Sequence, residues 1–93
     1  MWGVESMLEK EVIIGNPLGL HARPAAKFVK LSQGFSSEVY LEKNGERVSG
    51  KSILEVLMLA AEKGERIKII VDGKDEEEAL KVLTRFLEGK EEI

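Results

Sequence analysis

The only histidine of this 93-residue chain, His21, lies where a loop meets an expected helix. Asn16, Pro17 and Gly19 before it are turn formers, and the residues from Ala22 onward suit a helix. We therefore expect His21 at a helix N-terminus, where backbone N–H groups and the helix dipole favour anions, phosphate above all. A nucleophilic imidazole beside such a site predicts a phosphohistidine.

The neighbours of His21 support this reading. Arg23 adds a fixed positive charge and a forked donor that matches phosphate oxygens. Pro24 fits a first helical turn, where its missing N–H would have no intrahelical partner. Taken alone, His21 could be an ordinary surface residue and Arg23 a solvated helix residue. A metal site is not expected, because the chain has no cysteine and no second histidine.

The run NPLGLHARPAA, residues 16–26, resembles the active-site signature of the HPr family, the histidine phosphocarriers of the bacterial sugar phosphotransferase system. The resemblance extends over about residues 7–89. It implies that His21 accepts a phosphoryl group on Nδ1 and that Arg23 is the family's active-site arginine. It also implies that the backbone N–H groups of Ala22 and Arg23 hold the phosphate.

The resemblance further implies partners. Enzyme I, charged by phosphoenolpyruvate, would phosphorylate His21, and the A domain or subunit of a sugar permease would receive the group. The chain would then be a carrier rather than an independent enzyme, with no cofactor and no metal. Ile53, Leu54 and Leu57, together with Lys27, are the candidate docking residues. At helical spacing these apolar residues could equally belong to the core.

Gly50-Lys51-Ser52-Ile53-Leu54 resembles, more weakly, the regulatory serine segment of the same family. Ser52 followed by Glu55 is also the sequence of a helix capping box, which is ordinary helix chemistry. The family reading makes Ser52 a target of a serine kinase/phosphorylase and a contact for a catabolite-control transcription factor. Glu55 departs from the usual pattern and would repel a phosphoserine. A corepressor role and a nitrogen-branch phosphocarrier are the alternative functions.

Bulk properties narrow the classes of protein. Ninety-three residues make one small domain, and we interpret residues 1–6 as an N-terminal extension of a domain over 7–93. A formal net charge of −3 argues against nucleic acid as a partner. No apolar run approaches the roughly 20 residues that span a bilayer, and no signal peptide is recognisable. We therefore expect a cytoplasmic monomer without membrane insertion.

The expected elements follow the order β-α-β-β-α-β-α. Strands are predicted at residues 8–14, 37–43, 46–49 and 66–72, and helices at 22–33, 52–59 and from Asp75 to Gly89. Asn44-Gly45 predicts a two-residue hairpin turn, and Asp75 with Glu78 predicts a second capping box. This order indicates an α+β two-layer domain. The resemblance selects the HPr-like open-faced sandwich, a four-stranded antiparallel sheet with three helices on one face.

Overall fold

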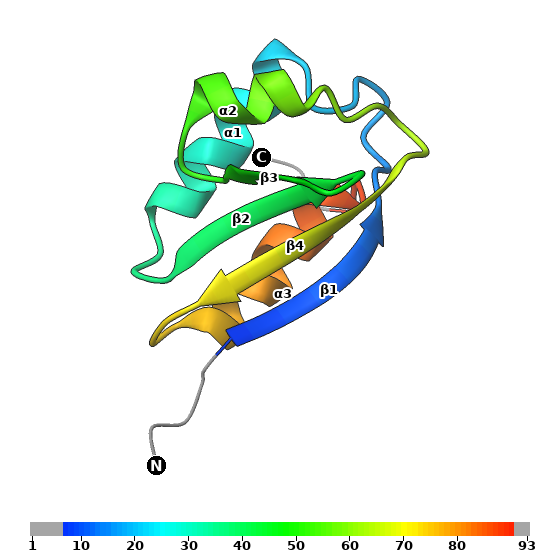
Figure 1. Ribbon diagram of the computed structural model, residues 1–93. Helices are drawn as coiled ribbons and strands as arrows, with labels where there is room; N and C mark the ends of the chain where they lie inside the picture. Colours follow the sequence, from blue (N-terminus) through cyan, green and yellow to red (C-terminus); the bar gives the residue numbers. More distant parts are fainter. Residues whose placement is uncertain (1–6, 91–93) are drawn as a thin grey trace.

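The computed structural model describes residues 7–90, and the suggested extension at residues 1–6 lies outside this range. The elements are β1 (Met7–Ile13), α1 (Ala22–Gln33), β2 (Glu38–Lys43), β3 (Glu46–Ser49), α2 (Ile53–Leu59), β4 (Arg66–Asp72) and α3 (Glu76–Leu87). The strands form one antiparallel sheet in the order β1-β4-β2-β3 (Figure 1). The predicted fold class, element order and sheet are therefore confirmed.

Turn chemistry fixes the β2–β3 hairpin. Asn44 and Gly45 have φ values of +53° and +83°, so both central residues lie in the left-handed region that a type I′ turn requires. The turn sets the register, in which Lys43 faces Glu46 and Leu41 faces Val48. Because successive side chains on a strand alternate, this register directs Val39, Leu41 and Val48 to the same face of the sheet.

All three helices pack on that face. Buried residues of α1, α2 and α3 form one cluster with the inward side chains of the strands. Phe28 of α1 and Phe86 of α3 approach with ring centroids 6.2 Å apart, a distance at which tilted aromatic pairs attract. A single core between helices and sheet thus supports the short loops at the edges of the domain.

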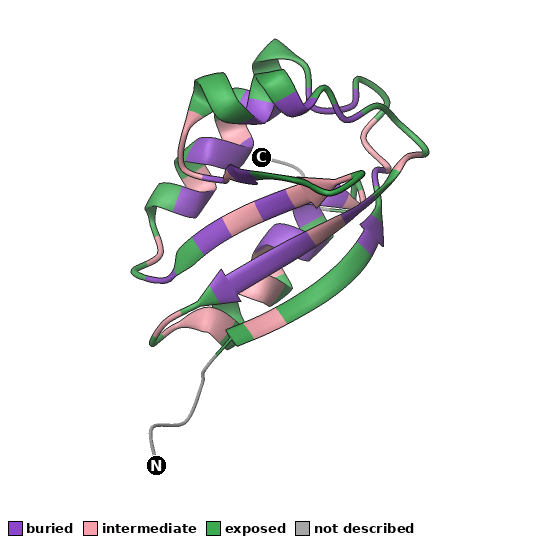
Figure 2. Cartoon of the chain, viewed as in Figure 1, coloured by how far each residue is buried: buried purple, intermediate pink, exposed green. Residues whose placement is uncertain are grey.

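The opposite face of the sheet carries an unexpected buried residue. Ile67, Ile69 and Val71 face the helices as predicted, but Ile70 is also buried, at 1% exposure. Ile70 lies on the open face, opposite Glu9 of β1 and Tyr40 of β2. Alternation along β4 does not predict this burial, since Ile70 lies on the inner strand β4 with neighbours on both sides. Figure 2 shows this contrast between the largely buried β4 and the largely exposed β1.

The expected cap at Asp75 is wrong. Asp75 occupies the N-cap position of α3, but its side chain makes no cap hydrogen bond. Its carboxylate instead accepts hydrogen bonds from the backbone N–H groups of Ser36 and Ser37 and from the Ser37 hydroxyl. The Ser37 hydroxyl, followed by the Ser36 N–H, lowers the pKa of Asp75 from 3.8 to about 2. Asp75 therefore anchors the α1–β2 loop to the start of α3.

Candidate functional site

His21 occupies the N-cap position of α1. Its backbone is extended, with φ −82° and ψ −169°, and its carbonyl accepts the first helical hydrogen bond from the N–H of Ala25 at 2.7 Å. The imidazole makes no cap hydrogen bond, and its side chain is 60% exposed. The predicted position of His21 at a helix start is thus the observed one, and the ring is open to a partner.

The loop before His21 is held by its own hydrogen bonds and by a second loop that packs against it. The Oδ1 of Asn16 accepts a hydrogen bond from the N–H of Leu18 at 3.0 Å, and the N–H of Gly19 donates to the Asn16 carbonyl at 2.9 Å. Gly19 has a φ of +62°, and a Cβ there would lie 2.8 Å from the carbonyl oxygen of Ala61. Glycine is therefore needed at this position both for its backbone conformation and for the close approach of a second loop.

That second loop brings Glu62 to the histidine. The Nε2 of His21 lies 2.9 Å from the Oε1 of Glu62, and the two residues are 41 positions apart in the sequence. A carboxylate accepts hydrogen bonds but does not donate them, so the proton of this contact belongs to Nε2. Sequence analysis missed Glu62, since no local spacing connects the segment after α2 with the segment before α1.

The first turn of α1 directly follows His21. Ala22 and Arg23 are exposed, Pro24 is buried, and the turn contains no acidic residue. The N–H groups in the first turn of an α-helix have no intrahelical acceptor, and Pro24 contributes none. The predicted phosphate-binding residues therefore lie together beside His21. Lys27 lies one turn further along α1 and is partly buried.

The three apolar docking candidates lie on α2, which packs beside α1, the helix that carries Lys27 (Figure 1). Leu54 is 70% exposed, and Ile53 and Leu57 are exposed to 38% and 37%. They are therefore surface residues rather than core. Met58, at 70% exposure, and Leu18, at 57%, are two further exposed apolar residues that sequence analysis did not select. We call the four exposed apolar residues of α2, Ile53, Leu54, Leu57 and Met58, the apolar patch.

Ser52 forms half of the expected capping box. Its Oγ accepts a hydrogen bond from the N–H of Glu55 at 3.3 Å, as an N-cap serine does. The Glu55 carboxylate does not return to the N–H of Ser52 but accepts from the N–H of Ser49 at 2.8 Å. Glu55 therefore closes the turn between β3 and α2, while Ser52 caps the helix.

A comparison with known proteins decides the family. The family model described as "PTS HPr component phosphorylation site" matches residues 8–89. The chain belongs to the HPr family. It is 48% identical to phosphocarrier protein HPr of Neisseria meningitidis over 89% of this chain and 93% of the relative.

Solved structures agree with the family and the fold. Phosphocarrier protein HPr from Bacillus anthracis superposes with a TM-score of 0.86 at 39% identity, covering 88% of this chain and 98% of that one. The solution structure of Crh, the Bacillus subtilis catabolite repression HPr, is 40% identical, with a TM-score of 0.67 over 92% of this chain and 100% of that one. The domain is thus an HPr phosphocarrier fold of the phosphotransferase system.

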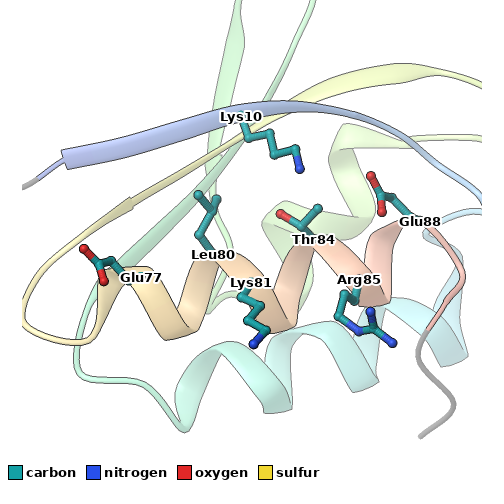
Figure 3. Close-up of a pocket in the computed structure, with 7 residues that line it drawn as sticks. All are labelled: Lys10, Glu77, Leu80, Lys81, Thr84, Arg85 and Glu88. Atoms are coloured by element: carbon teal, nitrogen blue, oxygen red, sulfur yellow. The ribbon is translucent and has the colours of Figure 1, made fainter.

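One depression of this HPr domain lies away from His21. A depression of about 230 Å³ lies between β1 and α3 (Figure 3). Its lining consists of Lys10, Glu77, Leu80, Lys81, Thr84, Arg85 and Glu88. Charges of both signs alternate there. The lining has no histidine, and its single hydroxyl, that of Thr84, is buried, so the depression does not offer the imidazole chemistry of His21.

Over residues 7–90, no group of three or more His, Asp or Glu side chains is arranged to hold a metal ion. In the same range, no helix has the length and apolar character needed to cross a membrane.

Proposed function

We propose that this chain carries a phosphoryl group on Nδ1 of His21, taking it from phospho-enzyme I and passing it to the A component of a sugar permease. One observation carries the proposal. His21 stands exposed at the open start of α1 with Nε2 directed to Glu62, which leaves Nδ1 as the ring nitrogen with a lone pair. Membership of the HPr family supports the same chemistry.

The phosphoryl group would be held at the helix start. The N–H groups of Ala22 and Arg23 and the Arg23 guanidinium supply donors and positive charge where the oxygens of the transferred group would lie. These contacts stabilise charge without a metal or an organic cofactor. In this proposal the chain is a carrier whose turnover depends on its partners, and not an independent enzyme.

Partner proteins would dock on the apolar patch beside His21. Two of its residues, Leu54 and Met58, are exposed to 70%, and the positively charged Arg23 lies on the adjacent helix. A small apolar surface with charged neighbours suits a transient complex that must release each partner quickly. Lys27 and Ile53 complete the candidate docking surface. The proposed setting is a monomer in the cytoplasm, where enzyme I and the permease A component would both reach it.

The test is direct phosphorylation. The full chain is incubated with enzyme I and labelled phosphoenolpyruvate, and the product is analysed for stoichiometry and stability. One phosphate per chain, labile in acid and stable in alkali, is expected on His21, and His21→Ala should take up none. Label retained by His21→Ala, or an acid-stable product, would contradict the proposal. The nitrogen-branch alternative predicts phosphorylation only by an enzyme I paralogue.

A regulatory role through Ser52 is a second candidate, favoured by the similarity to the catabolite repression HPr. In this role a serine kinase/phosphorylase would modify Ser52, and the product would bind a catabolite-control transcription factor. The start of α2 favours added negative charge, but the Glu55 carboxylate in the same turn opposes it. Phosphorylation rates of the wild type and of Glu55→Gln with such a kinase decide whether Glu55 is the obstacle. Equal rates would reject that argument.

A further inference from the structure

We propose that Glu62 is a positioning residue for phosphoryl transfer. Its carboxylate holds the imidazole of His21 with the proton on Nε2 and the lone pair on Nδ1, and it stabilises the positive charge that the ring gains on phosphorylation. This inference rests on the proposed function of His21. It assigns a task to a residue that lies outside both the helix start and the apolar patch.

The contact itself selects one form of the ring. A neutral imidazole carries its proton on either nitrogen, and the form present follows from the hydrogen bond that one nitrogen makes. The Oε1 of Glu62 lies 2.9 Å from Nε2 and can only accept. Protonated Nε2 is therefore favoured, and Nδ1 is left free to attack.

The backbone of Glu62 is fixed by a network that does not involve His21. Its N–H donates to the Oε1 of Glu65 at 2.7 Å. The ammonium of Lys43 donates to the same Oε1 at 3.2 Å and to the carbonyl of Ala60 at 3.0 Å. The Glu62 N–H, followed by Lys43, lowers the pKa of the Glu65 carboxyl below its ordinary value. Glu65 therefore remains a charged anchor at neutral pH.

Backbone hydrogen bonds join this segment to the loop that carries His21. The N–H of Leu20, the residue before His21, donates to the carbonyl of Ala61, the residue before Glu62, at 2.8 Å. At the other end of the two segments, the N–H of Ile14 donates to the carbonyl of Glu65 at 2.9 Å, and the N–H of Gly64 donates to the carbonyl of Ile14 at 2.8 Å. Figure 1 shows the two segments side by side at the same end of the sheet. These hydrogen bonds therefore hold the backbones of His21 and Glu62 close together.

The transfer step shows what the carboxylate does. The lone pair of Nδ1 forms a bond to phosphorus while the bond from phosphorus to the donor atom of the phosphorylated partner breaks, and that electron pair leaves with the donor. Nε2 keeps its proton throughout, so the ring becomes an Nδ1-phosphoryl imidazolium. A carboxylate next to Nε2–H stabilises this cation, in the manner in which an aspartate orients and stabilises a catalytic histidine. When the phosphoryl group is passed on, the same steps run in reverse.

The expected effect is moderate, because the contact is open to water. The side chains of His21 and Glu62 are exposed to 60% and 57%. Exposed ion pairs contribute little, and a partner that covers the ring would strengthen the contact by excluding water. We therefore expect a change by about two- to fivefold when the charge of Glu62 is removed, the range that exposed charge pairs support.

The first measurement is spectroscopic and needs no partner. His21 is the only histidine, so the chain labelled with ¹⁵N-histidine gives the signals of one imidazole. At alkaline pH, where an imidazole is neutral, Nε2 of the wild type is expected to be protonated and Nδ1 unprotonated. In Glu62→Gln the ratio of the two tautomers should shift by about two- to fivefold toward Nδ1–H, because an amide can accept or donate. An unchanged ratio would overturn the inference.

The second measurement is kinetic, with enzyme I as the phosphoryl donor. Glu62→Gln should lower kcat by about two- to fivefold and leave KM unchanged, since the residue acts on the ring rather than on docking. Glu78→Gln is the matched control. It makes the same change in net charge as Glu62→Gln. Glu78 lies on the first turn of α3, which follows the end of β4, whereas Glu62 precedes the start of this strand, which is about 20 Å long.

The outcomes separate the two proposals. Equal effects of Glu62→Gln and Glu78→Gln, or a rise in KM alone, would reject the positioning role. If no variant, including the wild type, accepted a phosphoryl group, the proposed function would fail. The ratio of tautomers would then still report whether Glu62 selects the proton position on His21.

Discussion

The starts of α1 and α2 differ in what their N-cap side chains do. Ser52 closes α2 by accepting from the N–H of Glu55, and the Glu55 carboxylate adds negative charge to that turn. His21 leaves α1 open, since its ring turns away from the helix to Glu62 and no acid lies in the first turn. Both N-cap residues have an extended backbone, yet one helix start is capped by its side chain and the other still has donors for an anion.

The start of α3 extends this contrast. Asp75 is a good N-cap residue by type, yet its carboxylate binds the backbone of Ser36 and Ser37 instead of capping the helix. Residue type at the N-cap therefore does not decide its task. The direction of the side chain does, and that direction depends on which distant segment the fold brings close.

The largest expected effect comes from placing a capping side chain at the start of α1, as Ser52 does at the start of α2. His21→Asn places a strong N-cap residue at the position and removes the nucleophile. Phosphoryl uptake should be lost completely, while α1 should gain up to about 1 kcal/mol of stability. Label incorporation and the melting temperature measure the two effects. A large fall in melting temperature would show that the His21 side chain itself stabilises the folded domain.

The next effect concerns the charge at the open start. Arg23→Ala should lower the rate of phosphoryl transfer by about tenfold to a hundredfold, because hydrogen bonds with charged groups contribute about 1.5–3 kcal/mol. Arg23 is exposed, so thermal unfolding should be unaffected. Lys30→Ala, which removes an exposed positive charge from the last turn of α1, is the control. Equal rates for both variants would mean that only net charge matters.

Much of the fold could be predicted, because its signals are local. The stripe on α1, the alternation in β2 and the Asn44-Gly45 turn each indicate their element within a few residues. The helix start at His21 could be predicted for the same reason. The side of the sheet that the helices cover needed the family resemblance, since several folds share the element order.

What could not be predicted depends on contacts between distant segments. Glu62 reaches His21 only because the loops at residues 15–21 and 60–65 are hydrogen-bonded together. Asp75 was assigned a cap because the chain nearby offers one, but the loop at Ser36 and Ser37 competes for its carboxylate. Ile70 is buried on a strand that has neighbours on both sides, and periodicity along one strand does not report those neighbours.

A third prediction tests whether enzyme I docks on α2 while phosphoryl transfer takes place at the start of α1. Leu54→Glu should raise KM for enzyme I by about tenfold, which corresponds to about 1.4 kcal/mol of binding, and leave kcat unchanged. Leu54 is 70% exposed, so the melting temperature should not change. Ile13→Glu is the control, since Ile13 is 51% exposed on the open face of the sheet. A comparable rise in KM for Ile13→Glu would place docking elsewhere.

A fourth prediction tests whether the Ser52 cap at the start of α2 contributes to stability alone. Ser52→Ala removes the acceptor for the N–H of Glu55 and should cost about 1 kcal/mol of folding free energy. For a domain of this size that lowers the melting temperature by about 4–8 °C. Phosphoryl transfer to His21 measured well below the melting temperature should be unchanged. Slower transfer at full folding would show that Ser52 also acts on the docking surface.

The smallest effect is a pH dependence at α3. The pKa of Asp75 is lowered from 3.8 to about 2, so its hydrogen bonds to Ser36 and Ser37 stabilise the folded state above pH 3.8. This contribution is lost as the pH falls from 3.8 toward 2, because in this range the carboxyl of the unfolded chain is protonated while that of the folded chain is still ionised. Asp75→Asn should therefore melt below the wild type at neutral pH, and the difference should shrink through this acid range. Asp72→Asn, at the exposed end of β4, is the control. A difference between Asp75→Asn and the wild type that stays constant down to pH 2 would mean that the charge of Asp75 does not contribute, and that the loop is held by the shape of the side chain alone.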